Sequence, residues 1–426
     1  MLNFLKKINK QEIIVVFLIY TAFLGISIIS FNDYGISVDE WELRILGFSN
    51  LKYVMNIFFE NKSNNLNSIL DIPELSDYLG THGAIFAMPM AFVEYLFNID
   101  DSRTYYLLRH YSNHLIFLIS TFFFYNIVKE RFNNWIYGIL GVLFLFLSPR
   151  IFAESFYNHK DLIFLSFFII NLYYGINFLR NINLVNAGLF AFTTALSIDI
   201  RIMGIIIIPS ILLPMLIKNS KKIKKIIFPY LAFYFFLLIL FTILFWPYLW
   251  ENPLINFLKV FQTLSSFPHE GYNFYLGEYT LASFSPWHYI PVWILITTPP
   301  LYLFLFLFGL SSYFSKFLKQ ENYFKTFNNQ LETEDLIYFM LFFVPIVLVI
   351  VLNSTLYNGW RHLYFVYPCI IIFSIKGIDL VKSNFFKNKK WLPEILITIL
   401  LIQISLSMVK NHPHQNVYFN FIAGKN

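Results

Sequence analysis

The feature that most constrains this chain is a series of apolar stretches, each long enough to cross a lipid bilayer as a helix. The 426 residues are 57% apolar and only 13% charged, which excludes an ordinary soluble domain. A spanning helix needs about 20 mostly apolar residues. Eleven segments are candidates: 13–31, 105–128, 134–152, 161–179, 183–200, 202–217, 226–246, 288–311, 336–353, 362–380 and 391–409. The sequence therefore predicts an all-α, polytopic transmembrane helix bundle that forms a single domain over residues 1–426.

The cations of the connecting segments predict which side of the membrane each one faces. Lys and Arg gather on the cytoplasmic side of membrane proteins. The cation-bearing segments are the N-terminal start with Lys6, Lys7 and Lys10, and residues 129–131, 180, 218–225, 316–325 and 382–390. All of them face inside if the short segment 83–98 lies in the interface and does not span. We therefore expect the N-terminus inside and the C-terminus outside. The net charge of +6 reflects this topology, and no nucleic-acid partner is predicted.

Two long loops are expected on the outer side. The first, 32–104, is too long for a simple connector and is predicted to hold two interfacial helices. One has its apolar residues near one face (Trp41, Ile45, Phe48, Met55 and Phe58), and the other is 83–98. The second loop, 247–287, is rich in Pro, Gly and aromatic residues. The single cysteine, Cys369, excludes an intramolecular disulfide and a Cys-rich metal site.

Acidic residues stand at the outer ends of the predicted spans. Asp39 and Glu40 are neighbours, so on a helix their side chains diverge by about 100° and only one can point into a given cavity. Asp161 opens a span directly after His159 and Lys160. Charges at a membrane boundary cost free energy unless they have a function, which suggests a general base or a cation site. The alternative is that these acids only cap helix N-termini.

Basic residues are also predicted on the outer side. Arg361 and His362 begin a span, and an Arg can bind phosphate through two parallel charge-assisted bonds. The alternative for Arg361 is snorkelling to the lipid headgroups. The roles of Asp199 and Arg201 are left open, and the simplest interpretation is that they neutralise each other at a helix end. His412 and His414 form a pair that would be a weak metal site.

In their order along the chain, these short motifs resemble the GT-C superfamily of membrane glycosyltransferases, nearest the protein O-mannosyltransferase and aminoarabinose transferase type. The residues that carry the resemblance are Val38-Asp39-Glu40, Thr81-His82-Gly83, Leu147-Ser148-Pro149-Arg150-Ile151, Asn158-His159-Lys160-Asp161, Gly359-Trp360-Arg361-His362 and the tail 412–420. This chain lacks the prolines that follow the matching histidine in the family. The resemblance implies a GT-C-like fold over most of the chain.

The resemblance also implies a polyprenyl-phosphate-linked sugar donor, used on the non-cytoplasmic face with inversion at the anomeric carbon. Asp39 would be the general base, and Glu40 and Asp161 would orient groups or bind a cation. Substrate contacts are expected from His82, His159, Lys160, Arg361 and His362. The acceptor would be a lipid, a glycan or a protein. No cofactor is identified from the sequence, and a divalent cation is left open.

Two other functions fit the same pattern of charges. One is a secondary transporter with an outward-facing ion or substrate site, although its charges would be expected near the bilayer midplane. The other is a non-catalytic bundle that acts as an assembly partner. The glycosyltransferase hypothesis places the chain in the inner (plasma) membrane as a multi-pass protein, with its active site facing the periplasm or outside.

Overall fold

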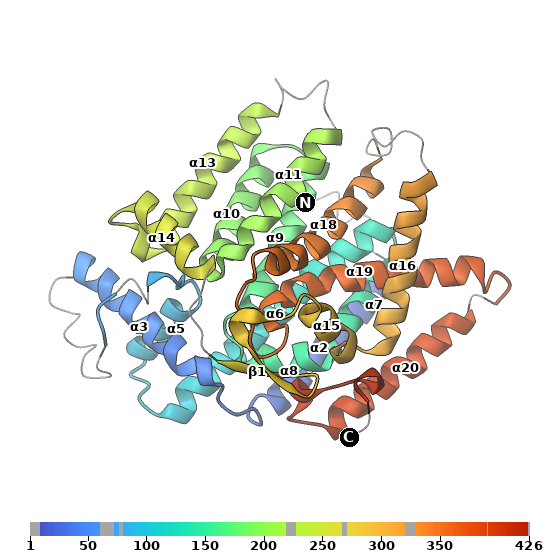
Figure 1. Ribbon diagram of the computed structural model, residues 1–426, viewed down its shortest axis with the longest axis horizontal. Coiled ribbons are helices and arrows are strands. Elements are labelled where there is room, and N and C mark those ends of the chain that lie inside the picture. Colours follow the sequence, from blue (N-terminus) through green and yellow to red (C-terminus); the bar gives the residue numbers. More distant parts are fainter. Residues whose placement is uncertain are drawn as a thin grey trace.

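The protein is helical throughout most of its length (Figure 1). The computed structural model describes residues 9–59, 72–75, 80–218, 227–265, 271–319, 329–389 and 391–424. The expected inner lysines at positions 6, 7, 221, 222, 224, 225, 325 and 390 lie outside these residues. The α-helices are α2 (Lys10–Ser30), α3 (Val38–Phe58), α5 (Ala87–Leu96), α6 (Ser102–Phe132), α7 (Trp135–Phe146), α8 (Pro149–Tyr157), α9 (Asp161–Arg180), α10 (Leu184–Ile200), α11 (Ile207–Lys218), α13 (Phe228–Phe245), α14 (Pro253–Ser265), α15 (Tyr289–Thr297), α16 (Pro300–Lys319), α18 (Gln330–Val351), α19 (Tyr367–Asn384) and α20 (Trp391–Lys410).

Shorter elements join these helices. The 3₁₀ helices are η2 (Ile202–Ile206), η3 (Pro247–Leu249), η4 (Ala282–Phe284), η5 (Arg361–Val366), η6 (Gln415–Val417) and η7 (Phe421–Ala423). The strands are β1 (Tyr272–Tyr275) and β2 (Glu278–Leu281).

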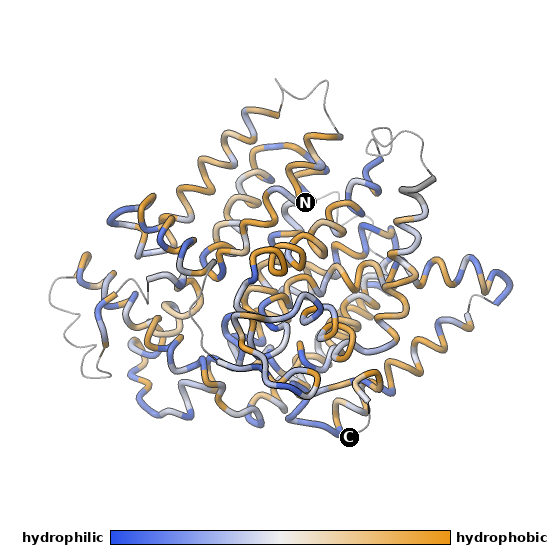
Figure 2. The backbone as a smooth tube through the Cα atoms, viewed as in Figure 1, coloured by the Kyte–Doolittle hydropathy of each residue, from blue (hydrophilic) through white to orange (hydrophobic). Residues whose placement is uncertain are grey.

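The apolar helices define a multi-pass membrane protein. Within the described residues, six helices are long and apolar enough to cross a membrane: α2, α9, α13, α18, η5 together with α19, and α20. The pair α7 and α8 would add a seventh if it forms one broken span. Figure 2 shows apolar residues dominating α13 and α20, with polar residues in the connection between α19 and α20. The all-α polytopic class is confirmed, and the number of eleven spans stays a prediction.

Close helix packing forms the core of the bundle. Helices α16 and α19 approach each other through Gly309 and Gly377, where an added Cβ would lie 1.9 Å from the Phe373 oxygen and 2.0 Å from the Leu305 oxygen, respectively. Small residues allow such backbone contact between membrane helices. Helix α9 packs between α6 and α10, with most of its apolar side chains fully buried. This arrangement fixes Asp161, the first residue of α9, relative to its neighbours.

Prolines break several of the predicted spans. The predicted span 134–152 is two helices, α7 and α8, bent by 67° at Leu147-Ser148. Ser148 has an extended backbone because it precedes Pro149, and a residue before proline disfavours the helical conformation. The segment 288–311 is likewise divided into α15 and α16 at Thr298-Pro299. As a result, α8 does not continue the axis of α7 and brings Arg150, Glu154 and Tyr157 to the wall of a cavity.

The first long loop contains α3 and α5, which pack against each other. Helix α5 has ten residues, so at about 1.5 Å per residue it is too short to span a bilayer. The prediction that the apolar residues of α3 share one interfacial face is wrong. Phe48 and Met55 are buried, whereas Trp41 and Phe58 are 42% and 63% exposed. The buried side chains form a small core with Ile72 and Ala91.

The second long loop contains ordered elements that the sequence analysis did not predict. Its first part is α14, and its second part is the antiparallel hairpin of β1 and β2, in which Tyr275 pairs with Glu278. The two residues between the strands, Leu276 and Gly277, have φ angles of 51° and 89°. Positive φ at both positions is typical of the tight turn that suits a two-residue hairpin. The hairpin contributes to the cavity through Tyr272, Asn273 and Phe274.

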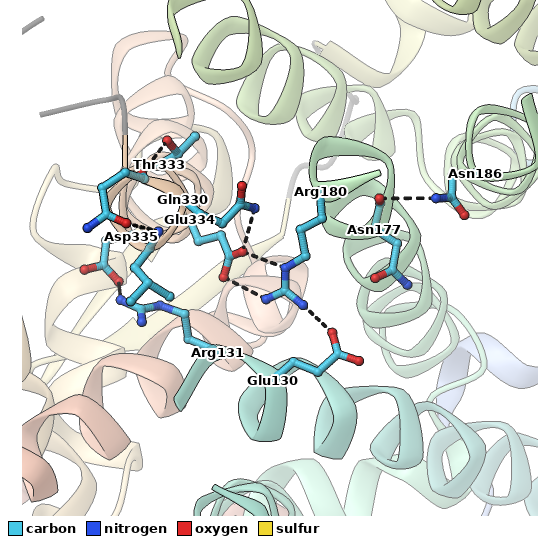
Figure 3. Close-up of polar contacts among 11 residues, drawn as sticks. Glu130, Arg131, Asn177, Arg180, Asn186, Gln330, Thr333, Glu334 and Asp335 are labelled. Carbon is cyan, nitrogen blue, oxygen red and sulfur yellow. Dashed lines mark hydrogen bonds and ion pairs between the residues drawn. The ribbon is translucent and has the colours of Figure 1, made fainter. Parts of the chain in front are cut away.

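Charged side chains gather at two ends of the bundle, separated by the length of α9. At the end where α9 finishes, Arg180 donates two bonds to Glu334, at 2.8 and 3.0 Å, and also pairs with Glu130 (Figure 3). Arg131 and Lys376 both pair with Asp335, at 2.5 and 2.6 Å. We call these six residues the Arg180 network: Glu130, Arg131, Arg180, Glu334, Asp335 and Lys376. Asp161 begins the same helix at the other end, about 30 Å away for 20 residues.

Candidate active site

A cavity of about 750 Å³ lies at the Asp161 end of the bundle. Segments far apart in sequence form its wall: residues 33–39, α8, β1, α15, the turn 358–361 and the tail 413–419. Of the residues predicted for the site, Asp39, His159 and Arg361 line it. The wall also carries aromatic side chains, among them Tyr289 and Trp293. A cavity with apolar walls and a few convergent polar groups is the usual form of a small-molecule site.

Arg361 connects two of the predicted acids. Its Nη1 donates to Oδ2 of Asp39 at 2.6 Å, and its Nε lies 3.7 Å from Oδ2 of Asp161. The side chain of Asp39 is 42% exposed, whereas that of Asp161 is 1% exposed. Asp161 also pairs with Arg201 and accepts a hydrogen bond of 3.0 Å from Asn158 Nδ2. Asp39 is therefore the more accessible acid, and Asp161 is held in place by its partners.

A tight turn aims Arg361 at the cavity. Asn358 and Gly359, with φ angles of 56° and 76°, adopt left-handed conformations, which Asn and Gly tolerate better than other residues. The backbone N–H of Gly359 donates to the hydroxyl of Tyr289 at 3.2 Å. The Tyr357 ring lies 5.0 Å from the guanidinium of Arg361. The Arg361 side chain is thus held by an aromatic ring as well as by its ion pair, and its role as a phosphate contact, against the headgroup anchor, stays a prediction.

Glu40 points away from Asp39 into the protein. Its Oε1 accepts a 2.6 Å hydrogen bond from the backbone N–H of Ser37, which completes a capping box at the start of α3. Its Oε2 lies 2.9 Å from Nε2 of His110 and 3.7 Å from Nε2 of His159. The capping role considered from sequence is thus present for Glu40. The partners from α6 and from the α8–α9 turn show that it also joins three elements.

His82 and Lys160 lie beside a second, much smaller cavity, of about 20 Å³. His159 lines both cavities. Burial lowers the pKa of Lys160 to about 7, with the neighbouring Arg201 acting in the same direction. Burial, together with Arg109, also lowers the pKa of His159 well below its usual value. Close to neutral pH, His159 is therefore an uncharged imidazole and Lys160 is only partly charged.

The remaining predicted residues have different surroundings. His362 stacks edge-on against Tyr357 with ring centroids 4.6 Å apart, and it does not belong to the lining of either cavity among the described residues. The predicted pairing of Asp199 with Arg201 is wrong. Arg201 pairs with Asp161, and Asp199 accepts a 2.8 Å bond from the backbone N–H of Ile85. The close packing of the Asp199 carbonyl on Gly83, where a Cβ would lie 1.9 Å away, explains why the two chain segments meet there.

Several polar residues near the cavities were not proposed as site residues from sequence. Arg150 lies 5.2 and 4.8 Å from the rings of Trp293 and Phe419, and its Nε donates to the Tyr418 carbonyl at 3.1 Å. Glu154 accepts bonds of 2.7 Å from Tyr364 and Asn158. The available signal for Glu154 was its position one helical turn before Asn158.

A buried cluster behind the small cavity was also missed. Glu94 of α5 pairs with Arg44 of α3 at 2.8 Å and with Arg109 of α6. All three side chains are at most 4% exposed. The cluster holds α3, α5 and α6 together directly beside His110. No sequence spacing signals it, because its members come from three separate elements.

Together, the fold and this site define a multi-pass membrane protein with a charged cavity at one end of its helix bundle. Residues 108–246 match the family model of the dolichyl-phosphate-mannose-protein mannosyltransferases. These 139 of the 426 residues, about a third of the chain, run from α6 to Trp246 and include His159, Lys160 and Asp161. The match confirms the resemblance noted from sequence and supports glycosyltransferase activity in general. No curated protein is similar enough to the chain to count as a match.

Proposed function

We propose that this protein transfers a sugar from a polyprenyl-phosphate donor to a hydroxyl of an acceptor, on the non-cytoplasmic face of the plasma membrane. The observation that carries the proposal is the contact between Asp39 and Arg361 at the wall of the large cavity. It puts an accessible carboxylate and a guanidinium at the same place. The family that matches residues 108–246 is described as using dolichyl-phosphate mannose, which makes a lipid-phosphate donor the first choice here.

The reaction assigns a different role to each of the two groups. Asp39 accepts the proton of the acceptor hydroxyl, and the oxygen of that hydroxyl forms a bond to the anomeric carbon of the sugar. The bond between that carbon and the phosphate oxygen breaks, and the phosphate leaves with the electron pair. Attack opposite to the leaving group inverts the anomeric configuration. General-base help of this kind contributes about 10²–10⁴ in rate.

Arg361 is proposed to bind the phosphate in the ground state and as it departs. Guanidinium and phosphate form two parallel charge-assisted hydrogen bonds. A departing phosphate needs no general acid, because its negative charge is held by cations. Asp161 and Arg201 are positioning residues in this scheme, since Asp161 lies between the two guanidinium groups. Lys160 and His159, at the adjoining small cavity, are further candidates for substrate contact.

The test is transfer by the purified full-length protein in detergent or nanodiscs. Polyprenyl-phosphate mannose is tried first and a panel of other polyprenyl-phosphate sugars second, with lipid, glycan and peptide acceptors. We expect radiolabelled sugar to move to one acceptor class, with the inverted anomer shown by NMR of the product. Uptake of a solute into proteoliposomes without any sugar transfer would instead support the secondary transporter, which the family match does not favour.

A further inference from the structure

We infer that Glu40, His110 and His159 form a binding site for a first-row divalent metal ion of the zinc type. One oxygen or nitrogen from each of the three side chains lies within 4.8 Å of the others. Glu40 Oε2 is 2.9 Å from His110 Nε2 and 3.7 Å from His159 Nε2. A shared ion needs ligand atoms this close together, at about 2.0–2.2 Å from the metal.

The burial of the three side chains supports a ligand. Glu40, His110 and His159 are 0%, 1% and 4% exposed. Within the described residues, neither ring nitrogen of His159 has a hydrogen-bond partner, and Nδ1 of His110 also has none. Buried polar groups without a partner are costly and rare in native proteins. A metal ion bound by His159 Nε2 would give one of these atoms a partner.

The chemistry of the three ligands selects the metal class. Mg²⁺ and Ca²⁺ take oxygen ligands almost entirely, whereas imidazole suits zinc and the later first-row ions. Two histidines and one carboxylate, with a water as the fourth ligand, are a common open zinc set. The small cavity beside His159 has about 20 Å³, which is enough for one water molecule. His159 lines that cavity but Glu40 and His110 do not, so it offers space for a water on the His159 side of the site.

The surrounding charges bear on that fourth ligand. Arg44 and Arg109 share the single carboxylate of Glu94, which leaves one positive charge in excess next to the site. Lys160 also lines the small cavity. These cations favour an anion in the open position.

An ion at this position would hold in place the segments that carry Asp39 and Asp161. Its ligands come from the start of α3, from α6 and from the α8–α9 turn. Glu40 directly follows Asp39, and His159 is two residues before Asp161. The ion would thus fix the two segments that carry these acids. Metal binding itself does not depend on the proposed sugar transfer, so the two proposals can fail separately.

The experiment measures metal content in the full-length protein, purified through a peptide-epitope tag without immobilised metal. We expect about one equivalent of zinc by mass spectrometry after dialysis against micromolar Zn²⁺, since the three ligands and a water form one site. His159→Ala and His110→Ala should lose the bound zinc. Glu40→Gln should weaken binding while its amide oxygen can still cap α3. His288→Ala is the matched control, since His288 pairs with Tyr275 and lines neither cavity.

A second readout separates the site from a general effect on folding. Co²⁺-loaded wild-type protein should show the visible spectrum of a site with nitrogen and oxygen ligands, and Glu40→Gln should change it while size-exclusion behaviour stays the same. The inference is overturned if the wild type retains no zinc and takes up none. It is equally overturned if the three variants and the His288→Ala control all hold as much zinc as the wild type.

Discussion

At the residue scale, the contact between Asp39 and Arg361 links binding of the donor phosphate to removal of the acceptor proton in the proposed reaction. Arg361 contacts Oδ2 of Asp39 at 2.6 Å, and a donor phosphate would compete for the same guanidinium. Phosphate binding would therefore release the carboxylate that must accept the acceptor proton. Because the side chain of Asp39 is 42% exposed and that of Arg361 is 13% exposed, the acid can move more easily than the guanidinium.

Replacing Asp39 by Asn tests the base. Asn can still accept a hydrogen bond from Arg361 but cannot take a proton, so we expect turnover to fall by about 10²–10⁴ with a small change in donor KM. Glu42→Gln, an exposed acid on the same helix, is the matched control and should keep wild-type turnover. Steady-state kinetics with saturating donor measure both. Full turnover by a folded Asp39→Asn protein would mean that the base is another group.

Replacing Arg361 by Lys tests the phosphate contact. Lysine keeps the charge but cannot form two parallel bonds. Charge-assisted bonds are worth about 1.5–3 kcal/mol each, so we expect donor kcat/KM to fall at least about tenfold. The control is Arg103→Lys, an exposed arginine at the start of α6. Equal donor efficiency in both variants would contradict the contact and leave Arg361 as a membrane anchor.

The sequence indicated part of this site, and physical reasons explain the rest. Asp39, Asp161 and Arg361 come from three separate segments. They were predicted to lie on the same side of the membrane, and in the structure Arg361 lies close to both acids. The divergence of neighbouring helical side chains anticipated that Asp39 and Glu40 would separate. His110 was missed because its partner Glu40 lies 70 residues away. No local pattern specifies a pairing between separate helices.

At the scale of elements, the Arg180 network joins the ends of α6 and α9 to the start of α18 and the middle of α19. Removing one partner of a buried ion pair leaves an uncompensated charge. Glu334 has no exposed side-chain area, and it receives both bonds from Arg180. Because α9 is a single helix from this network to Asp161, the network can stabilise the bundle without contacting the large cavity.

Glu334→Gln is the variant that separates stability from catalysis. We expect unfolding in detergent at a lower temperature, corresponding to a loss of roughly 3 kcal/mol, with donor KM unchanged in the folded protein. Glu332→Gln, two residues earlier on the same helix and only partly buried, is the control and should melt close to wild type. Thermal unfolding and kinetics are measured on the same preparations. A changed donor KM with an unchanged melting temperature would contradict the structural role.

At the scale of the whole molecule, hydropathy predicted the class of protein more reliably than it predicted the number of membrane crossings. Nine of the eleven predicted segments contain no break in the structure, if η2 is counted with α11 and η5 with α19. The other two are interrupted: 134–152 at Ser148 and 288–311 at Thr298-Pro299. Composition alone cannot distinguish a spanning helix from two shorter helices that are buried by their neighbours. The prolines in these segments indicate a break in the helix, but the direction that the chain takes after the break depends on packing.

The orientation of the bundle is the last prediction, because the proposed face of action depends on it. Asn388 and His414 are exposed and lie on either side of α20, a helix of 20 residues, about 30 Å long. With Cys369 replaced by Ala, single cysteines at 388 and 414 should react with a membrane-impermeant maleimide from opposite sides. The distribution of lysines predicts that Asn388→Cys is labelled only after permeabilisation and His414→Cys in intact cells. Labelling of both from one side would mean that α20 does not cross the membrane. Labelling of Asn388→Cys alone in intact cells would place the cavity in the cytoplasm and exclude the proposed face of action.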